Sequence, residues 1–107
     1  MSDRLESAIK KAIMDYLATR PNTFAFRVST TGIPDTSLPG GFRKNLMVGV
    51  SDIIGVKNGK FFALEVKTRD GKLTEHQERF LKRVDKAGGY GAVVRCVEDA
   101  VQCWGEI

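Results

Sequence analysis

Residues 48–67 read VGVSDIIGVKNGKFFALEVK and carry the clearest structural signal in the chain. Two runs rich in β-branched and aromatic residues flank Asn58-Gly59, and a two-residue type I′ turn needs positive φ at both of its central positions. With Asn58 and Gly59 in the turn, Lys57 faces Lys60, and every further pair follows from the same register. The stretch therefore predicts a β-hairpin of defined register.

This register gathers three charged residues at one end of an otherwise apolar hairpin. Asp52 faces Glu65, and directly opposed residues have Cβ atoms about 4.5–5.5 Å apart on the same face of the sheet. Lys67 lies two residues beyond Glu65 and shares that face. Because hydrophobic residues fill both faces, we expect central strands that are covered on both sides. These residues are Ile54, Val56, Phe61 and Ala63 on one face, and Ile53, Phe62, Leu64 and Val66 on the other.

Opposed carboxylates on one sheet face repel each other, so their placement favours a bound cation. Mg²⁺ prefers oxygen ligands and takes one or two protein carboxylates together with water and substrate phosphate oxygens. Lys67 would then hold the attacking water or stabilise the charge that grows on phosphorus. The alternative is that Asp52, Glu65 and Lys67 are ordinary strand-end charges that reach solvent.

Hydrophobic periodicity predicts the elements on the N-terminal side of the hairpin and the last strand. Apolar residues recur at three- and four-residue steps over residues 3–19, just before Pro21, which predicts an amphipathic helix. Alternation over residues 23–29, and the composition of residues 90–96, predict strands. Residues 31–47 lack periodicity, which predicts a long loop of a length that is often functional.

A second helix is predicted after the hairpin. Thr74 and Gln77 have the spacing of a capping box, and the apolar stripe that follows ends at Gly88-Gly89. Residues 98–104 favour a short helical turn. The predicted order is helix, strand, loop, strand, strand, helix, strand, which is an α/β arrangement.

Two further polar residues are candidates for the site of the acidic pair. Glu6 falls within the apolar arc of the first helix, so it faces the core or the rim of an active site. The alternative is that Glu6 compensates the helix dipole in the first turn. Gln77 has a structural alternative too, in which its side chain completes the capping box with Thr74.

The chain is basic, with 17 Lys+Arg against 13 Asp+Glu over 107 residues and a net charge of +4. We expect one domain spanning residues 1–107, and a basic domain of this size is compatible with a polyanionic partner. Arg43 and Lys44 make the long loop basic, and Arg69 and Lys72 are candidates for contacts to nucleic-acid phosphates. Other basic residues fit either a phosphate track or a solvated outer helix face; they are Arg79, Lys82, Arg83 and Lys86.

Several classes of protein are excluded by what the sequence lacks. No apolar run approaches the roughly 20 residues that span a bilayer, and the N-terminal segment is charged where a signal peptide is apolar. We therefore expect a cytoplasmic protein with no membrane partner. Cys96 and Cys103 form no CxxC pair and His76 is the single histidine, so neither a disulfide framework nor a zinc site is indicated. Both cysteines are expected to be small buried hydrophobic residues.

Three stretches together resemble the VRR-NUC family of the PD-(D/E)XK nuclease superfamily. They are Gly49-Val-Ser-Asp52, Glu65-Val-Lys67, and Gly71-Lys-Leu-Thr-Glu-His-Gln77 with Gly88-Gly89 downstream. The resemblance covers about residues 45–97, and Ser51 stands where the superfamily motif frequently has proline. It implies a restriction-endonuclease-like αβββαβ core, in which a mixed central sheet is flanked by helices.

The same resemblance implies roles for individual residues. The metal-binding acids of the family correspond to Asp52 and Glu65, with the main-chain carbonyl of Val66 as a further ligand of Mg²⁺, or of Mn²⁺ in its place. The catalytic residues that the resemblance implies are Asp52, Glu65, the lysine Lys67, the helical glutamine Gln77 and the first-helix acid Glu6. Small stand-alone members resemble phage-type enzymes that act as dimers on branched DNA, which implies a bacterial or phage-infected host cell.

Residues and resemblance together predict a Mg²⁺-dependent, structure-selective endodeoxyribonuclease. It would hydrolyse phosphodiester bonds in branched DNA such as four-way (Holliday) junctions. Symmetric resolution of a junction requires two cuts, so we expect a homodimer with paired sites. Apolar residues of the long loop either form the dimer surface or cap the domain's own core; they are Leu38, Phe42, Leu46 and Met47. The alternative function is a non-catalytic nucleic-acid-binding module that keeps the nuclease fold.

Overall fold

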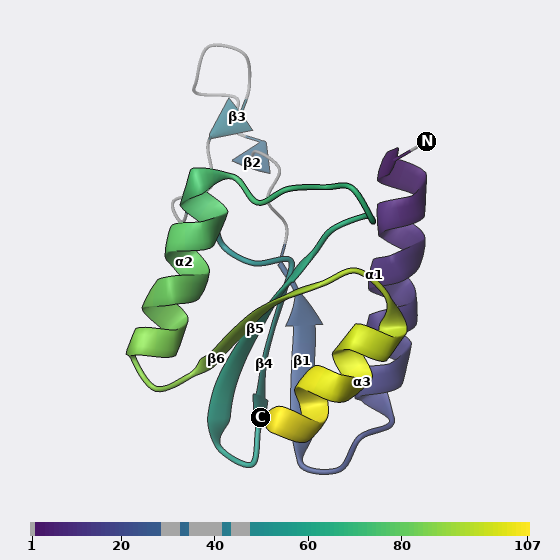
Figure 1. Ribbon diagram of the computed structural model, residues 1–107, viewed down its shortest axis with the longest axis vertical. Helices are drawn as coiled ribbons and strands as arrows, with labels where there is room; N and C mark the ends of the chain where they lie inside the picture. The colour runs from purple at the N-terminus through teal and green to yellow at the C-terminus, as the bar shows by residue number, and fades with distance from the viewer. Residues whose placement is uncertain (1, 29–32, 35–41, 44–47) are drawn as a thin grey trace.

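The computed structural model describes residues 2–28, 33–34, 42–43 and 48–107. Helices pack on both sides of a central sheet (Figure 1). In chain order the elements are α1 Ser2–Ala18, β1 Thr23–Arg27, β2 Ile33–Pro34, β3 Phe42–Arg43, β4 Ile53–Lys57, β5 Lys60–Val66, α2 Glu75–Lys86, β6 Tyr90–Val94 and α3 Val97–Glu106. None of the helices in this part of the chain is long and apolar enough to cross a membrane.

The central sheet has the strand order β1-β4-β5-β6. Strand β4 is antiparallel to both β1 and β5, whereas β5 and β6 are parallel. A parallel neighbour needs a long crossover connection, and helix α2 provides it between β5 and β6. The sheet is therefore mixed and flanked by helices, which confirms the predicted fold class.

The β4–β5 hairpin turns at Asn58-Gly59, as the sequence predicts. The φ angles of these two residues are 50° and 82°, and a type I′ turn requires positive φ at both positions. Lys57 pairs with Lys60, and the predicted register continues along both strands. A two-residue signal in the sequence therefore determines which residues oppose each other at the far end of the hairpin.

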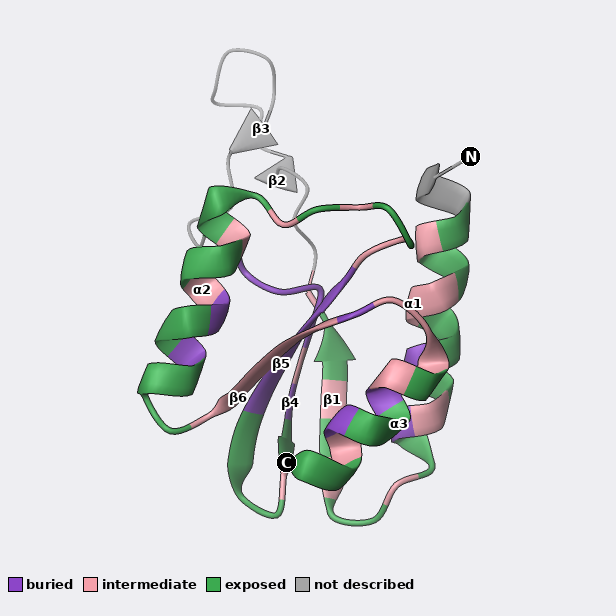
Figure 2. Cartoon of the chain, viewed as in Figure 1, coloured by how far each residue is buried: buried purple, intermediate pink, exposed green. Residues whose placement is uncertain are grey.

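The main hydrophobic core lies between one face of the sheet and helices α1 and α3, where buried residues gather (Figure 2). Phe62 of β5 is fully buried there. Helix α1 packs on it with Ile13 and Leu17, and helix α3 with Ala100 and Cys103. Burial of each large apolar side chain stabilises the fold by about 1.5–3 kcal/mol. The burial of Cys103 agrees with its expected role as a small hydrophobic residue.

Helix α2 covers only part of the opposite face. Leu81 and Val84 pack on Ala63 of β5, but one helix about 10 Å wide spans only about two strands. Over the described residues the β1 and β4 side of this face stays open, so the expectation that both hairpin faces are covered is wrong at Val56 and Phe61. The large hydrophobic residues left exposed on it are Phe24 (69 %), Phe26 (47 %), Val56 (40 %) and Phe61 (40 %).

The segment predicted as a loop over residues 31–47 contains two short strands. Ile33–Pro34 pairs antiparallel with Phe42–Arg43. The prediction of loop throughout is wrong at these positions, because a ladder of two residues is too short to produce an alternating pattern. Four candidates in this segment lie outside the described residues: Leu38, Lys44, Leu46 and Met47.

Helix α3 is longer than the turn predicted over residues 98–104. It runs over Val97–Glu106, and its N-cap Cys96 makes no side-chain cap hydrogen bond. The sequence therefore lacks the usual capping residue that marks a helix start. Asp99 in the first turn instead bonds back to the chain before the helix, since its Oδ2 accepts from the main-chain N–H of Arg95 over 2.9 Å. Cys96 itself is half-buried and not buried as expected.

Candidate active site

Asp52 and Glu65 meet at one end of the central sheet. Ile53 pairs with Leu64 at the last pair of the hairpin, and the two acids stand one residue further along each strand. The main-chain N–H of Val66 donates to Asp52 Oδ2 over 2.9 Å. The structure thus brings together the two acids that the predicted register opposes.

The two acids are buried, and their pKa values move in opposite directions. Asp52 is 8 % exposed and Glu65 is 2 % exposed. Burial, together with the hydrogen bond and the charge of Asp52, raises the pKa of Glu65 to about 9. Burial also acts to raise the pKa of Asp52, but hydrogen bonds from Glu65 and the Val66 N–H, with the charge of Lys10, hold that pKa below its ordinary value. Near neutral pH the pair is therefore an Asp52 carboxylate and a protonated Glu65.

This pair offers oxygen ligands to a hard cation. Within the described residues, Glu65 Oε1 and the neighbouring Ser51 Oγ are buried without a hydrogen-bond partner. A buried polar atom without a partner is costly, and a divalent cation would satisfy Glu65 Oε1 and keep both carboxylates ionised. The donor set therefore fits Mg²⁺.

Only two carboxylates contribute to this donor set. Over the part of the chain that the structure describes, no three His, Cys, Asp or Glu side chains come together in a way that could hold a metal. Mg²⁺ typically takes one or two protein carboxylates and fills its remaining positions with other oxygens. Backbone, water and substrate phosphate oxygens would complete the coordination here.

Lys67 follows β5 at the same end of the sheet. Its main-chain N–H donates to the carbonyl of Val94 over 3.0 Å, which extends the pairing of β5 with β6 by one residue. Its side chain is half-buried, and its positive charge acts against the raised pKa of Glu65. Lys67 therefore acts electrostatically on the acidic pair, as its place in the register leads us to expect.

Helix α1 adds a second lysine, which the motifs in the sequence do not single out. Lys10 Nζ lies 3.2 Å from Asp52 Oδ1 and 3.5 Å from Glu6 Oε1. Glu6 is therefore linked to the acidic pair through Lys10. The signal that could have found Lys10 is its spacing, since residues 6, 10, 13 and 17 form one helical stripe that includes the buried Ile13 and Leu17.

Gln77 lies in the first turn of α2, where it closes a capping box. The Thr74 N–H donates to Gln77 Oε1 over 2.9 Å, and the Gln77 N–H donates to Thr74 Oγ1 over 3.2 Å. The structure therefore confirms the capping role, which the sequence gives as the structural alternative for Gln77. A catalytic role for Gln77 stays a prediction.

Gly49 brings this first turn of α2 against the segment that carries Asp52. Its φ is 81°, and a Cβ on it would overlap the main-chain carbonyl of His76. Only glycine meets both the positive φ and this close approach without strain. Helix α2 therefore rests directly on the segment that leads into the acidic pair.

The basic residues that the sequence offers for nucleic-acid binding fall in two places. Arg69 and Lys72 lie exposed on the connection from β5 to α2, which crosses over the end of the sheet (Figure 1). Arg43 belongs to β3, and Lys44 lies outside the described residues. Arg69 and Lys72 are therefore close along the chain to Lys67 and the acids.

The basic residues of α2 are partly used within the helix itself. Arg79 pairs with Glu75 at 3.1 Å, and Lys82 pairs with Glu78 at 3.0 Å. Exposed pairs four residues apart stabilise a helix by about 0.2–0.5 kcal/mol each. These pairs support the solvated outer face as the role of Arg79 and Lys82.

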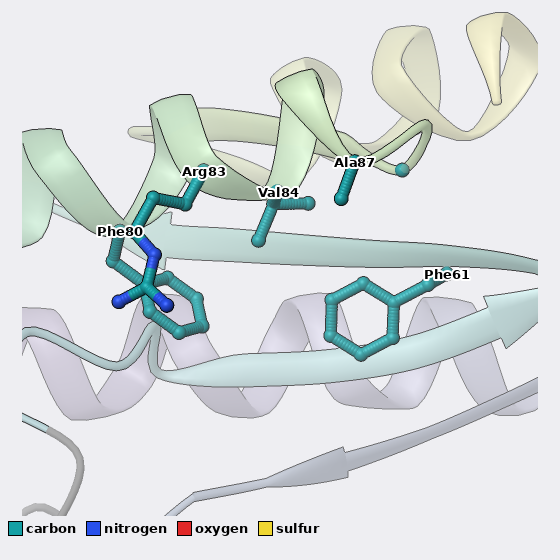
Figure 3. A pocket seen from close by; sticks show the side chains of 6 residues that line it. Phe61, Phe80, Arg83, Val84 and Ala87 are labelled. Atoms are coloured by element: carbon teal, nitrogen blue, oxygen red, sulfur yellow. The ribbon is translucent and has the colours of Figure 1, made fainter.

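A cleft of about 410 Å³ opens between α2 and β5, and it is separate from the acidic pair. Phe61 on the strand, Val84 on the helix and Ala87 at the C-cap of the helix line it (Figure 3). Arg83 is the charged residue in a lining that also includes Phe80 and Gly89. Through Phe61 the cleft joins the exposed hydrophobic face of the sheet and not the site of the acids.

A mixed sheet flanked by helices, with Asp52, Glu65 and Lys67 at one end of its central strands, is consistent with the PD-(D/E)XK class of nucleases. The model of the VRR-NUC domain family matches residues 4–98. The chain belongs to this family, which gives it a nuclease-type function. A search of curated proteins finds no significant match.

A solved structure described as a VRR_NUC domain has the same fold. It superposes with a TM-score of 0.66, and the match covers 94 % of this chain and 95 % of that chain. The two sequences are 19 % identical, so this likeness shows the fold alone. It confirms the α/β architecture expected from the sequence.

Proposed function

We propose that the protein is a Mg²⁺-dependent, structure-selective DNA endonuclease that hydrolyses phosphodiester bonds in branched DNA such as four-way junctions. The observation that carries the proposal is the buried pair of Asp52 and Glu65 beside Lys67, in which Glu65 Oε1 has no hydrogen-bond partner among the described residues. Two adjoining buried acids weaken a fold, because they repel each other and one of them must stay protonated. A bound catalytic metal ion would offset this cost, because it would keep both carboxylates ionised.

Asp52, Glu65 and the main-chain carbonyl of Val66 are the groups that would hold the metal. When bound, the ion supplies positive charge to the scissile phosphate and lowers the pKa of a water molecule. The protein contributes a fixed donor set, because the Val66 N–H holds Asp52 Oδ2 in place. Mn²⁺ would serve as well, since carboxylate and carbonyl oxygens also suit it.

Two lysines give the site positive charge for an anionic substrate. An ammonium group carries three hydrogen-bond donors, so Lys67 is suited to orient the attacking water or to stabilise charge on the phosphate. Lys10, next to Asp52, adds a second positive charge. The exposed Arg69 and Lys72 extend this charge along the path to α2, where a DNA backbone would lie.

We also propose that the protein acts as a homodimer, because resolving a branch requires two cuts and this domain offers one site. The loop residues expected at the interface lie outside the described residues or, for Phe42, are described only as part of β3. Among the described residues, β1 is the outer strand of the sheet, and its exposed Phe24 and Phe26 rings lie 5.9 Å apart. Antiparallel pairing of two β1 strands would extend the sheet and place these rings beside those of the other copy.

Cleavage of labelled linear, flap and four-way-junction DNA, with Mg²⁺ or with a chelator, tests the proposed function. We expect cleavage that needs the metal and favours a branched substrate. Glu65→Ala should abolish cleavage because it removes a metal ligand, and Lys67→Ala should lose rate while keeping metal binding. Glu98→Ala, an exposed change on α3, is the matched control and should cleave normally.

Two results would contradict the proposal. Undiminished cleavage by Glu65→Ala in Mg²⁺ would show that Glu65 is not part of the active site. Tight binding of every DNA without cleavage, at any concentration of Mg²⁺ or Mn²⁺, would instead favour the non-catalytic binding module.

A further inference from the structure

Arg95 follows strand β6 and holds the connection that leaves the neighbouring strand β5. Its Nη1 donates to the main-chain carbonyls of Thr68 and Gly71, each over 2.7 Å, and to the carbonyl of Arg69 over 3.3 Å. Asp99 Oδ2 fixes the main chain of Arg95 itself. One charged side chain therefore binds three carbonyls of a single turn.

The turn that Arg95 holds begins directly after Lys67. The Gly71 N–H donates to the carbonyl of Thr68 over 3.1 Å and closes the turn. A Cβ built on Gly71 would lie 3.4 Å from Lys67 Cβ and 3.5 Å from Lys67 Cδ. The backbone of the turn therefore lies against the aliphatic stem of Lys67.

A lysine side chain needs such support if its ammonium is to point in one direction. Its flexible stem carries about 2 kcal/mol of rotamer entropy, and the β5 strand alone fixes only its backbone. The turn is partly exposed, since Arg69 and Asp70 reach solvent. Charge-assisted hydrogen bonds are roughly twice as strong as neutral ones, so the bonds from Arg95 give the turn a fixed position.

We propose that Arg95 is a positioning residue that fixes the direction of the Lys67 ammonium by clamping the turn from Thr68 to Gly71. The clamp is a property of the fold, and its effect on rate rests on the proposed nuclease function. Arg95 acts through the turn and through Lys67.

The first test observes Lys67 directly and does not depend on activity. Protein labelled with ¹³C-lysine gives one Cε signal for each lysine, and Lys67→Arg identifies the signal of Lys67. In Arg95→Ala we expect this signal to move toward the position of a free lysine. The signal of Lys10 should stay, because Asp52 and Glu6 hold it. Arg83→Ala, an exposed arginine on α2, is the matched control and should leave both signals in place.

Two further variants keep the test decisive if Arg95→Ala fails to fold. Arg95→Lys keeps the charge, but a lysine side chain ends one atom short of the position of Arg95 Nη1, which makes all three bonds, and it should move the Lys67 signal in the same direction. Gly71→Ala adds a methyl group against the Lys67 stem and leaves Arg95 untouched, and it should also move that signal. An unchanged Lys67 signal in a folded Arg95 variant overturns the proposal.

The second test measures the consequence for cleavage. We expect Arg95→Ala to lower kcat by about 100-fold with little change in KM or in Mg²⁺ affinity, because small misplacements of a catalytic group cost about this much. Ethylguanidinium in solution should restore part of the cleavage rate of Arg95→Ala and should leave the rate of Arg83→Ala unchanged. A raised KM or a weaker affinity for Mg²⁺, with kcat unchanged, contradicts the proposal. A wild-type protein that cleaves no nucleic acid contradicts the nuclease function instead, and the lysine signals then decide the clamp alone.

Discussion

Lys10 Nζ lies 3.2 Å from Asp52 Oδ1, where helix α1 meets the end of the central sheet. A positive charge from the protein is thus already beside the carboxylate that would hold a metal. Its attraction to Asp52 helps to keep this buried acid ionised. A divalent cation and Lys10 therefore compete for the same negative charge.

Replacing Lys10 by methionine should tighten Mg²⁺ binding. The variant removes the competing charge and keeps an unbranched side chain on the helix, so we expect roughly fivefold higher affinity, which corresponds to about 1 kcal/mol. Titration calorimetry at low salt measures this. Lys11→Met is the matched control, because Lys11 pairs with Asp15 on the exposed side of α1. Weaker binding in Lys10→Met would show that Lys10 supports the metal site.

Replacing Glu65 by glutamine should stabilise the metal-free protein, and increasingly so at higher pH. The pKa of Glu65 is raised from 4.5 to about 9 in the folded state. The unfolded chain therefore releases a proton that the folded chain keeps, and folding stability falls as pH rises between these two values. Glutamine stays neutral and can still donate to Asp52. The free energy of unfolding should therefore rise on the order of 2–3 kcal/mol at pH 7.

Urea unfolding at pH 5, 7 and 9 measures this difference. Glu98→Gln changes an exposed residue on α3. Its free energy of unfolding should differ from that of the wild type by the same amount at all three pH values. Equal pH dependence of the wild type and Glu65→Gln would mean that Glu65 ionises normally in the folded protein.

Replacement by alanine should have opposite effects on stability at two glycines, Gly59 in the hairpin turn and Gly105 in helix α3. No atom of the described residues lies within 4 Å of a Cβ added to Gly59 or to Gly105, so the added methyl group meets none of these residues. Gly59 has a φ of 82°, and Gly59→Ala should cost about 1 kcal/mol. Gly105 lies in helix α3, and Gly105→Ala should add about 0.5–1 kcal/mol. Thermal unfolding of the two variants compares them, and equal effects would exclude backbone strain at Gly59.

The outer strand β1 is the place to test the proposed dimer. The wild type should sediment with a mass near twice 11.8 kDa, and Phe26→Asp should sediment as a monomer because it places a charge in the proposed interface. Val101→Asp changes another exposed hydrophobic residue, on α3, and should stay dimeric. A wild type that remains monomeric with junction DNA bound would end the dimer proposal.

The sequence predicts the core of the site because its signals are local. Asn58-Gly59 sets the hairpin register, and the register alone brings Asp52 opposite Glu65. The capping box at Thr74 is equally local, since both of its hydrogen bonds join residues three apart. Predictions of this kind succeed because each depends on a few neighbouring residues.

Other features depend on contacts between distant elements. Lys10 reaches Asp52 only because α1 packs beside the sheet, and no single motif contains both residues. Arg95 and the turn after Lys67 meet only because β6 lies parallel to β5. The exposure of Val56 follows from the width of α2, since the hairpin sequence carries the same hydrophobic pattern whether or not a helix covers it.

Gly49 has a consequence for how this fold tolerates change. A side chain at position 49 would have to push α2 away, because the main-chain carbonyl of His76 occupies that space. Such a shift would move the helix relative to the segment that ends in Asp52, so a substitution three residues before Asp52 would disturb the acidic pair. The spacing between α2 and the acidic pair is therefore set by the absence of a side chain.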